Sequence, residues 1–121
     1  MLPLLAASAL LACTAVDGDT LRCGAERVRL IGIDAPELPG HCEGHRRCAP
    51  GDPWESKAAL ERQVRGRWVR LDRHGEDRYG RTLAFAWVGP RNLSCTQLRG
   101  GFAVYVRAWD LGGGAGRCPL N

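Results

Sequence analysis

The chain has 121 residues, with 17 basic and 13 acidic side chains and a formal net charge of +4. This length provides for one hydrophobic core and excludes two, and the composition is ordinary for a globular domain. The modest basic excess is compatible with a polyanionic partner but does not by itself identify one.

The first segment, residues 1–12, is apolar, rich in alanine and leucine, and free of charge. This composition is typical of the apolar part of a secretory signal, although no lysine or arginine precedes it. The segment is too short to span a membrane as a helix. Two alternatives remain: a lipoprotein cleavage site with Cys13 as the lipid anchor, or a first strand. We expect the folded domain to comprise residues 13–121.

Five segments have the alternating or continuous apolar pattern of strands: residues 13–16, 20–24, 28–33, 68–71 and 82–88. The first two flank Asp17-Gly18-Asp19-Thr20, which is typical of a tight hairpin turn. The third is almost continuously apolar, so we expect it to be buried on both faces. Pro36 disfavours continuation of this strand, and residues 38–51 and 72–80 are expected to be loops.

The first of two helices is predicted to begin at Asp52. Asp52 is a good N-cap, Pro53 suits the first helical position, and Glu55 completes a pattern that resembles a capping box. The helix is expected to include Val64 and to end at Gly66.

The second helix is short and is predicted to start after the cap Asn92 and to end at Gly100-Gly101. Residues 102–106 are expected to be extended or irregular. Residues 111–116 form a glycine-rich tail without periodicity.

Six cysteines in a chain of this size indicate an oxidising compartment. A turn centred on Gly18 places Cys13 opposite Cys23, close enough for a bridge. The full set that we predict is Cys13–Cys23, Cys42–Cys48 and Cys95–Cys118. For Cys42 and Cys48 a zinc site with His41 and His45 is the alternative, although the spacing is tighter than in a zinc finger.

Carboxylates gather where the third strand is expected to end. Asp34 and Glu37 flank Ala35, whose carbonyl is expected to face outward, and Asp19 lies in the preceding turn. Carboxylate and carbonyl oxygens suit a hard cation, so Asp19, Asp34 and the Ala35 carbonyl are predicted metal ligands. The alternative for Asp19 is ordinary turn chemistry.

Arginines accompany these carboxylates. Arg29 starts the strand that ends at Asp34, and Arg81 follows Asp77-Arg78-Tyr79-Gly80. Guanidinium groups placed on either side of a phosphate stabilise the charge that builds up during its hydrolysis. Arg29 and Arg81 are therefore candidate catalytic residues, the alternatives being an exposed strand-edge cation and an ion pair of Arg81 with Asp77.

Three motifs in this order resemble the staphylococcal nuclease family: residues 17–20, 29–37 and 77–81. The resemblance covers roughly residues 13–106. It implies an OB-fold, that is, a five-stranded Greek-key barrel, here with two short helices packed outside. It also implies Ca²⁺ as the ion, although the ligands themselves do not exclude Mg²⁺ or Mn²⁺.

The resemblance also implies roles for individual residues. Glu37 is expected to be the general base or to orient the attacking water, and Arg78 and Tyr79 to contact a second phosphate. Tyr105 is expected to stack on a base. The tryptophans are interpreted instead as packing residues: Trp54, Trp68, Trp87 and Trp109.

The function predicted from this set is metal-dependent hydrolysis of DNA and RNA with little sequence preference. We expect a monomer without a membrane span, secreted or periplasmic, whose partner is single-stranded nucleic acid as substrate. The rival interpretation is a non-catalytic OB-fold module that binds nucleic acid or protein, because a fold does not determine a function.

Overall fold

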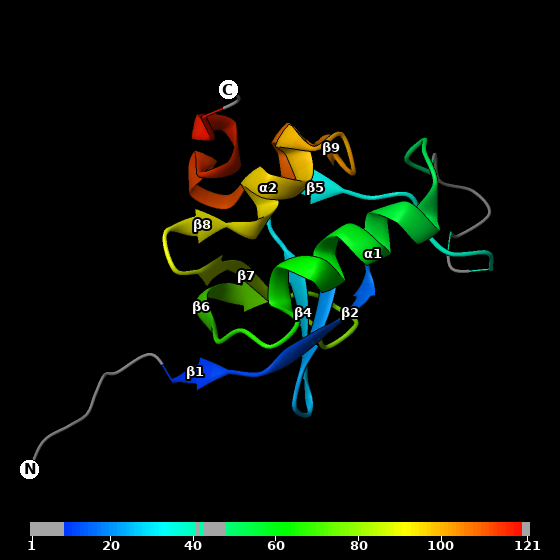
Figure 1. The fold of residues 1–121 in the computed structure, drawn as a ribbon. Coiled ribbons are helices and arrows are strands. Elements are labelled where there is room, and N and C mark those ends of the chain that lie inside the picture. Colours follow the sequence, from blue (N-terminus) through cyan, green and yellow to red (C-terminus); the bar gives the residue numbers. More distant parts are fainter. Residues whose placement is uncertain (1–8, 41, 43–47, 120–121) are drawn as a thin grey trace, which may run out of the picture.

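The computed structural model describes residues 9–40, 42 and 48–119 (Figure 1). Its main sheet has the strand order β1-β6-β7-β4-β3-β2, with β8 added beside β7. The strands of this sheet are β1 (Leu10–Leu11), β2 (Cys13–Asp17), β3 (Thr20–Cys23), β4 (Glu26–Leu30), β6 (Val69–Glu76), β7 (Thr82–Val88) and β8 (Arg91–Asn92). A separate pair joins β5 (Ile33–Asp34) to β9 (Val104–Tyr105).

The predicted class, mainly β with helices, is confirmed and is consistent with an OB-like fold. Strand pairing is antiparallel except between β4 and β7. The sheet differs from the predicted five-stranded barrel because it has more strands and is not closed by hydrogen bonds. Its two end strands, β1 and β2, are consecutive in the chain and are separated by Ala12.

One predicted strand is divided in two. Residues 28–33 form the end of β4, a turn at Ile31-Gly32, and β5. Gly32 has a φ of 84°, a value that glycine adopts readily and that a residue with a side chain adopts at a cost. The turn redirects the chain, so that β5 leaves the main sheet and pairs with β9.

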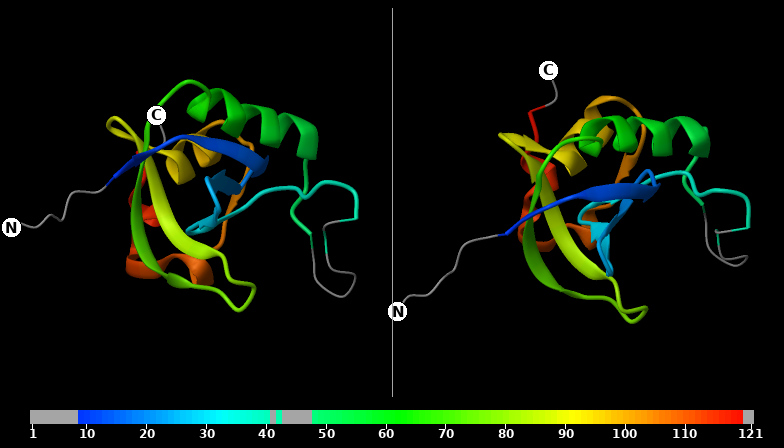
Figure 2. Two further views of the ribbon diagram at one scale, coloured as in Figure 1. Left: turned by 90° about the horizontal axis from the view of Figure 1, so that it is seen from below. Right: turned by 60° about the horizontal axis from the view of Figure 1, so that its bottom comes forward.

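A predicted loop, by contrast, is largely strand. β6 continues through Glu76 and pairs with β7, with a register shift between Arg73 and Gly75. Figure 2 shows the resulting β6–β7 hairpin projecting away from the helix at Pro53–Val64. The residues of β6 beyond Leu71 are exposed. For that reason their sequence lacks the apolar alternation of a half-buried strand.

The helices begin where their caps predict. α1 (Pro53–Val64) is capped by Asp52, whose side chain accepts hydrogen bonds from the amides of Trp54 and Glu55. α2 (Leu93–Arg99) is capped by Asn92. Short 3₁₀ turns follow at η1 (Arg107–Trp109), η2 (Leu111–Gly113) and η3 (Ala115–Arg117). None of the helices in the described ranges is long and apolar enough to cross a membrane.

The main core lies between α1 and the sheet, next to β2 (Figure 2). Leu60 and Val64 of α1 are fully buried there against Leu21 and Val28. A smaller cluster on Phe85 contains Ile31 and Ala115, so the glycine-rich tail packs against β7.

All six cysteines form disulfides in the predicted pairs. Cys13 and Cys23 are register partners across the β2–β3 hairpin, with a Cα–Cα distance of 4.2 Å. Cys95–Cys118 joins α2 to the tail. Because Cys42 and Cys48 bond to each other, the zinc alternative is wrong for these two thiols; His41 and His45 lie outside the described residues.

An ion pair at the start of β4 makes the stability of the folded protein depend on pH. Arg73 donates two hydrogen bonds of 2.8 Å to the Glu26 carboxylate, and Thr82 donates a third of 2.7 Å. The hydrogen bonds from Arg73 lower the pKa of Glu26 from 4.5 to about 2. A lowered folded-state pKa means that the stabilisation is complete above pH 4.5 and is lost as the pH falls towards 2.

We expect Glu26→Gln to lower the free energy of unfolding at pH 7 by about 1 kcal/mol, because Arg73 and the carboxylate are partly exposed. The variant should also lose less stability than wild type between pH 4.5 and 2. Urea unfolding over this pH range measures both effects. Equal losses for the two proteins would contradict the assignment.

Candidate active site

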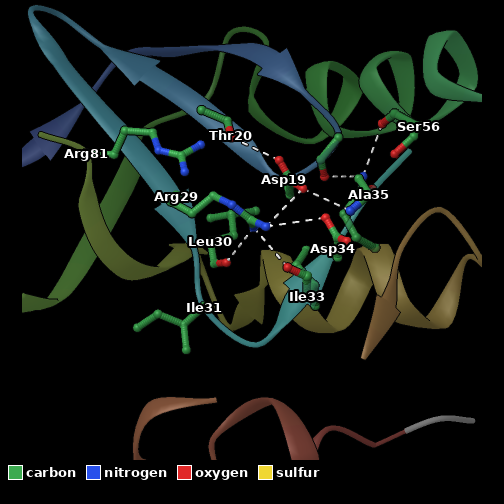
Figure 3. A network of polar contacts seen from close by, with 12 residues as sticks. Asp19, Thr20, Arg29, Leu30, Ile31, Ile33, Asp34, Ala35, Ser56 and Arg81 are labelled. Carbon is green, nitrogen blue, oxygen red and sulfur yellow. Dashed lines mark hydrogen bonds and ion pairs between the residues drawn. The ribbon is translucent and has the colours of Figure 1, made fainter. Parts of the chain in front are cut away.

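Two buried carboxylates converge on one arginine. Arg29, on β4, is 11% exposed in its side chain, and its Nη2 lies 3.4 Å from Asp19 Oδ2 and 3.5 Å from Asp34 Oδ1. Figure 3 shows the three side chains directed towards one another from the hairpin turn, β4 and β5. The expectation that Asp19 and Asp34 face the same point therefore agrees with the geometry.

Hydrogen bonds hold Asp19 in position. Its Oδ1 accepts a bond of 2.9 Å from the Thr20 hydroxyl, and its Oδ2 accepts one of 2.9 Å from the Ala35 amide. The backbone is fixed as well, since the Leu30 amide donates to the Asp19 carbonyl at 2.9 Å. These bonds connect the turn to the segment that follows β5, although the two are far apart in sequence.

The turn at Ile31-Gly32 brings Asp34 to Arg29. Ser94 of α2 donates to the Ile31 carbonyl at 2.8 Å, and the Val106 amide donates to the Gly32 carbonyl at 2.9 Å. Arg29 itself donates from Nη1 to the Ile33 carbonyl at 2.9 Å. Arg29 therefore contacts both carboxylates and also the backbone that carries one of them.

Gln97 supports the β2–β3 hairpin turn, which carries Asp19. This buried side chain donates from Nε2 to the Gly18 carbonyl at 2.8 Å and to the Ser56 carbonyl at 3.1 Å. Gly18 approaches α1 so closely that a Cβ there would lie 1.7 Å from Ser56 Oγ. The glycine and the glutamine thus fix the residue next to Asp19 against α1, a role that the sequence did not reveal.

A cavity of about 660 Å³ opens beside these residues. Its lining comprises Val16, Asp17, Asp19, Thr20, Arg22, Arg27, Arg29, Glu37, Gly40, Arg78, Tyr79, Arg81 and Trp109. Six predicted site residues from three separate segments therefore line one cavity: Asp19, Arg29, Glu37, Arg78, Tyr79 and Arg81. Asp34 and Ala35 are buried and do not line it. The expectation that the Ala35 carbonyl faces outward is therefore wrong, because Ala35 packs into the main core.

Asp77 orients Arg81. Its Oδ1 accepts bonds of 2.9 Å from the amides of Tyr79 and Arg81, and its Oδ2 accepts one of 2.7 Å from Arg81 Nε. Burial acts to raise the pKa of Asp77, but the hydrogen bonds from Arg81 outweigh it and lower that pKa. The predicted ion pair is present, and Figure 3 shows the Arg81 guanidinium directed towards Arg29 and Asp19, which line the cavity with it.

Tyr79 lies between two guanidinium groups. The centre of Arg78 is 5.1 Å and that of Arg81 is 5.6 Å from the ring centroid. The predicted phosphate-contacting residues Arg78 and Tyr79 therefore lie together with Arg81 in the cavity lining.

Tyr105 has a different environment from the one that we predicted. It lies on β9 outside the cavity lining, and its hydroxyl donates to Asp110 Oδ2 at 2.8 Å. This hydrogen bond raises the pKa of Tyr105. Base stacking by Tyr105 remains a prediction, and the observed position does not favour it.

Trp109 is a residue whose position the sequence analysis missed. It is 43% exposed, lines the cavity, and has the Arg29 guanidinium 5.3 Å from its ring centroid. It was interpreted as a packing residue. Its position depends on Asp110, which accepts hydrogen bonds of 2.9 Å from the Ala115 and Gly116 amides and so folds the tail. An arginine–tryptophan contact between distant segments leaves no local sequence pattern.

The donor set offers oxygen to a cation. Asp19 and Asp34 supply two carboxylates, and their side chains are 5% and 7% exposed. Within the described ranges there is no group of three or more Asp, Glu, His or Cys side chains arranged to hold a metal. A hard cation would therefore need backbone oxygens and water as further ligands, which agrees with the oxygen-rich shells of Ca²⁺ and Mg²⁺.

Residues 27–113 match the protein family described as "Staphylococcal nuclease homologue". The chain is 34% identical over 96 residues to a thermonuclease from Staphylococcus intermedius, an alignment that covers 73% of this chain and 54% of that protein. It is 38% identical over 92 residues to an uncharacterized endonuclease from Haemophilus influenzae, with coverages of 72% and 46%. The chain spans about half the length of these relatives.

Proposed function

The chain belongs to the staphylococcal nuclease homologue family, and from this premise we propose that it is a nuclease that hydrolyses phosphodiester bonds of DNA and RNA with little sequence preference. The observation that carries the proposal is the arrangement around one cavity of Asp19, Arg29, Glu37 and Arg81. These residues come from three segments that are distant in sequence.

We propose Ca²⁺ as the ion, held by the carboxylates of Asp19 and Asp34 and by the Ala35 carbonyl. The support is the approach of both carboxylates to the same Arg29 nitrogen. A bound calcium ion supplies positive charge beside a phosphodiester oxygen. Mg²⁺ and Mn²⁺ also accept oxygen ligands, so the choice among these ions rests on the family.

Glu37 is the proposed general base. Its half-buried carboxylate takes a proton from water while the water oxygen bonds to phosphorus. As the family resemblance implies, the bond from phosphorus to the 5′-oxygen then breaks, and this oxygen takes a proton from solvent. The products are a 3′-phosphate end and a 5′-hydroxyl end.

Arg29 and Arg81 stabilise the charge that builds up on the phosphoryl oxygens. Arg29 is held by backbone carbonyls and Arg81 by Asp77, so neither guanidinium group has to reorganise during the reaction. Arg78 and Tyr79 are proposed to contact a neighbouring phosphate of the same strand.

We propose that the protein acts outside the cytoplasm, in a secreted or periplasmic form. The three disulfides support this proposal, because such bonds persist in oxidising compartments. A monomer remains the expected state.

The test is the cleavage of single-stranded DNA and of RNA in calcium and in excess chelator. We expect cleavage in calcium, loss of cleavage to the level of a protein-free sample in chelator, and recovery when calcium is restored. End-group analysis should find 3′-phosphates. Binding of DNA without any calcium-dependent cleavage would contradict the proposal and favour the non-catalytic module.

A further inference from the structure

Two arginines on the β3–β4 hairpin face each other across the strands. Arg22 and Arg27 are direct register partners, both are exposed, and both line the cavity. Like charges placed directly opposite in an antiparallel pair destabilise it. The Arg22–Arg27 arrangement is therefore unfavourable in the folded protein alone. A bound anion would reduce the repulsion between the two guanidinium groups.

No carboxylate of the described residues forms an ion pair with either arginine. Within the described part of the chain, the Arg22 side chain makes no hydrogen bond or ion pair, and the Arg27 side chain donates to the Tyr79 carbonyl. Glu26, next to Arg27, is engaged by Arg73 and Thr82.

The whole cavity has the same excess of positive charge. It is lined by five arginines and three carboxylates, a surplus of two positive charges, and one of those carboxylates belongs to Asp19, which already lies beside Arg29.

We propose that Arg22 and Arg27 form a second phosphate-binding site, in addition to the one proposed for Arg78 and Tyr79, which takes another phosphodiester near the scissile one in a polynucleotide chain. The inference rests on the proposed function and extends it. Arg29 is the register partner of Thr20, so the Arg22–Arg27 pair lies two residues further along the hairpin, about 7 Å away. Planar guanidinium groups suit phosphate oxygens, and their exposure lets a flexible strand reach them.

Arg22 is the better probe of the pair, because loss of Arg27 would also release the loop that carries Tyr79. Binding is measured with a fluorescein-labelled oligothymidylate in calcium, on the Glu37→Gln background so that the strand stays intact. Salt is varied from about 50 to about 300 mM. The added change is Arg22→Ala, with Arg91→Ala as the matched control, since Arg91 is exposed and does not line the cavity.

We expect Arg22→Ala to weaken binding about fivefold to tenfold and to reduce the slope of log affinity against log salt by about 0.7, the value for one contact with a single strand. Arg22→Lys should restore most of the slope. Without DNA, the melting temperature of Arg22→Ala should equal or exceed that of the background protein, because a like-charge contact is removed.

Each other result counts against the inference. A slope for Arg22→Ala equal to that of Arg91→Ala overturns it while leaving the proposed nuclease intact. A lower melting temperature for Arg22→Ala also overturns it, because it shows a structural role. If the Glu37→Gln protein binds no oligothymidylate at all, the proposed function itself fails, and the second phosphate site fails with it.

Discussion

Replacement of Glu37 by glutamine is expected to lower kcat for DNA cleavage by about 10³-fold, because the amide keeps the shape of the side chain but cannot take the proton from water. Glu37 lines the cavity and contributes no part of the buried core, so the fold should be retained. The substrate KM should change little. Initial rates with single-stranded DNA in calcium measure both constants.

Glu55→Gln is the matched control, since this exposed glutamate lies in the first turn of α1 and its replacement changes the net charge equally. The control should cleave at the wild-type rate. A Glu37→Gln protein that keeps about a third of the wild-type kcat or more would show that Glu37 is not the base. A loss of activity that reflects only a raised KM would show that it contributes to binding instead.

Local features of the fold were predictable because their signals are local. The side chains of Asp52 and Asn92 cap helices by accepting hydrogen bonds from backbone amides two or three residues further along the chain. The cap and the amides that it bonds therefore lie within one short stretch of sequence. Cys13 and Cys23 follow from the position of the hairpin turn, because a turn sets the register of its strands.

The errors arise where tertiary contacts decide the backbone. Residues 28–33 have the apolar pattern of one buried strand, yet Ser94 and Val106 hold a turn at Ile31-Gly32 from outside. The only local signal was Gly32 itself. Residues 72–76 were assigned to a loop because they are polar, although their backbone pairs with β7 without needing a buried face.

The candidate site likewise contains residues that sequence motifs predict and residues whose positions depend on tertiary contacts. Asp19, Arg29, Glu37 and Arg81 were predictable as a set because three motifs carry them in a recognisable order. Asp19 lies outside the family match at residues 27–113, so its approach to Arg29 comes from the structure. Trp109 and Arg22 were missed because their places depend on the folded tail and on strand register, which no single motif specifies.

Replacement of Arg29 by lysine is expected to lower kcat/KM by about 10²-fold to 10³-fold. The Arg29 guanidinium group makes two sets of contacts at once. Its Nη1 donates to the Leu30 and Ile33 carbonyls, and its Nη2 lies beside the carboxylates of Asp19 and Asp34. A lysine keeps the charge but has a single head group, so it cannot hold the backbone and face a phosphate at once. The loss of one preorganised donor to a developing charge corresponds to about 3 to 4 kcal/mol.

The same variant links the arginine to the proposed ion. With a lysine in place of Arg29, the buried carboxylates of Asp19 and Asp34 lose part of their compensation, which destabilises the protein in the absence of metal. Calcium should therefore raise the melting temperature of Arg29→Lys by more than that of wild type. Arg70→Lys serves as the control, because Arg70 is exposed on β6 outside the cavity lining. Equal calcium shifts for Arg29→Lys and wild type would argue that the two carboxylates do not hold the ion, whatever the loss of cleavage.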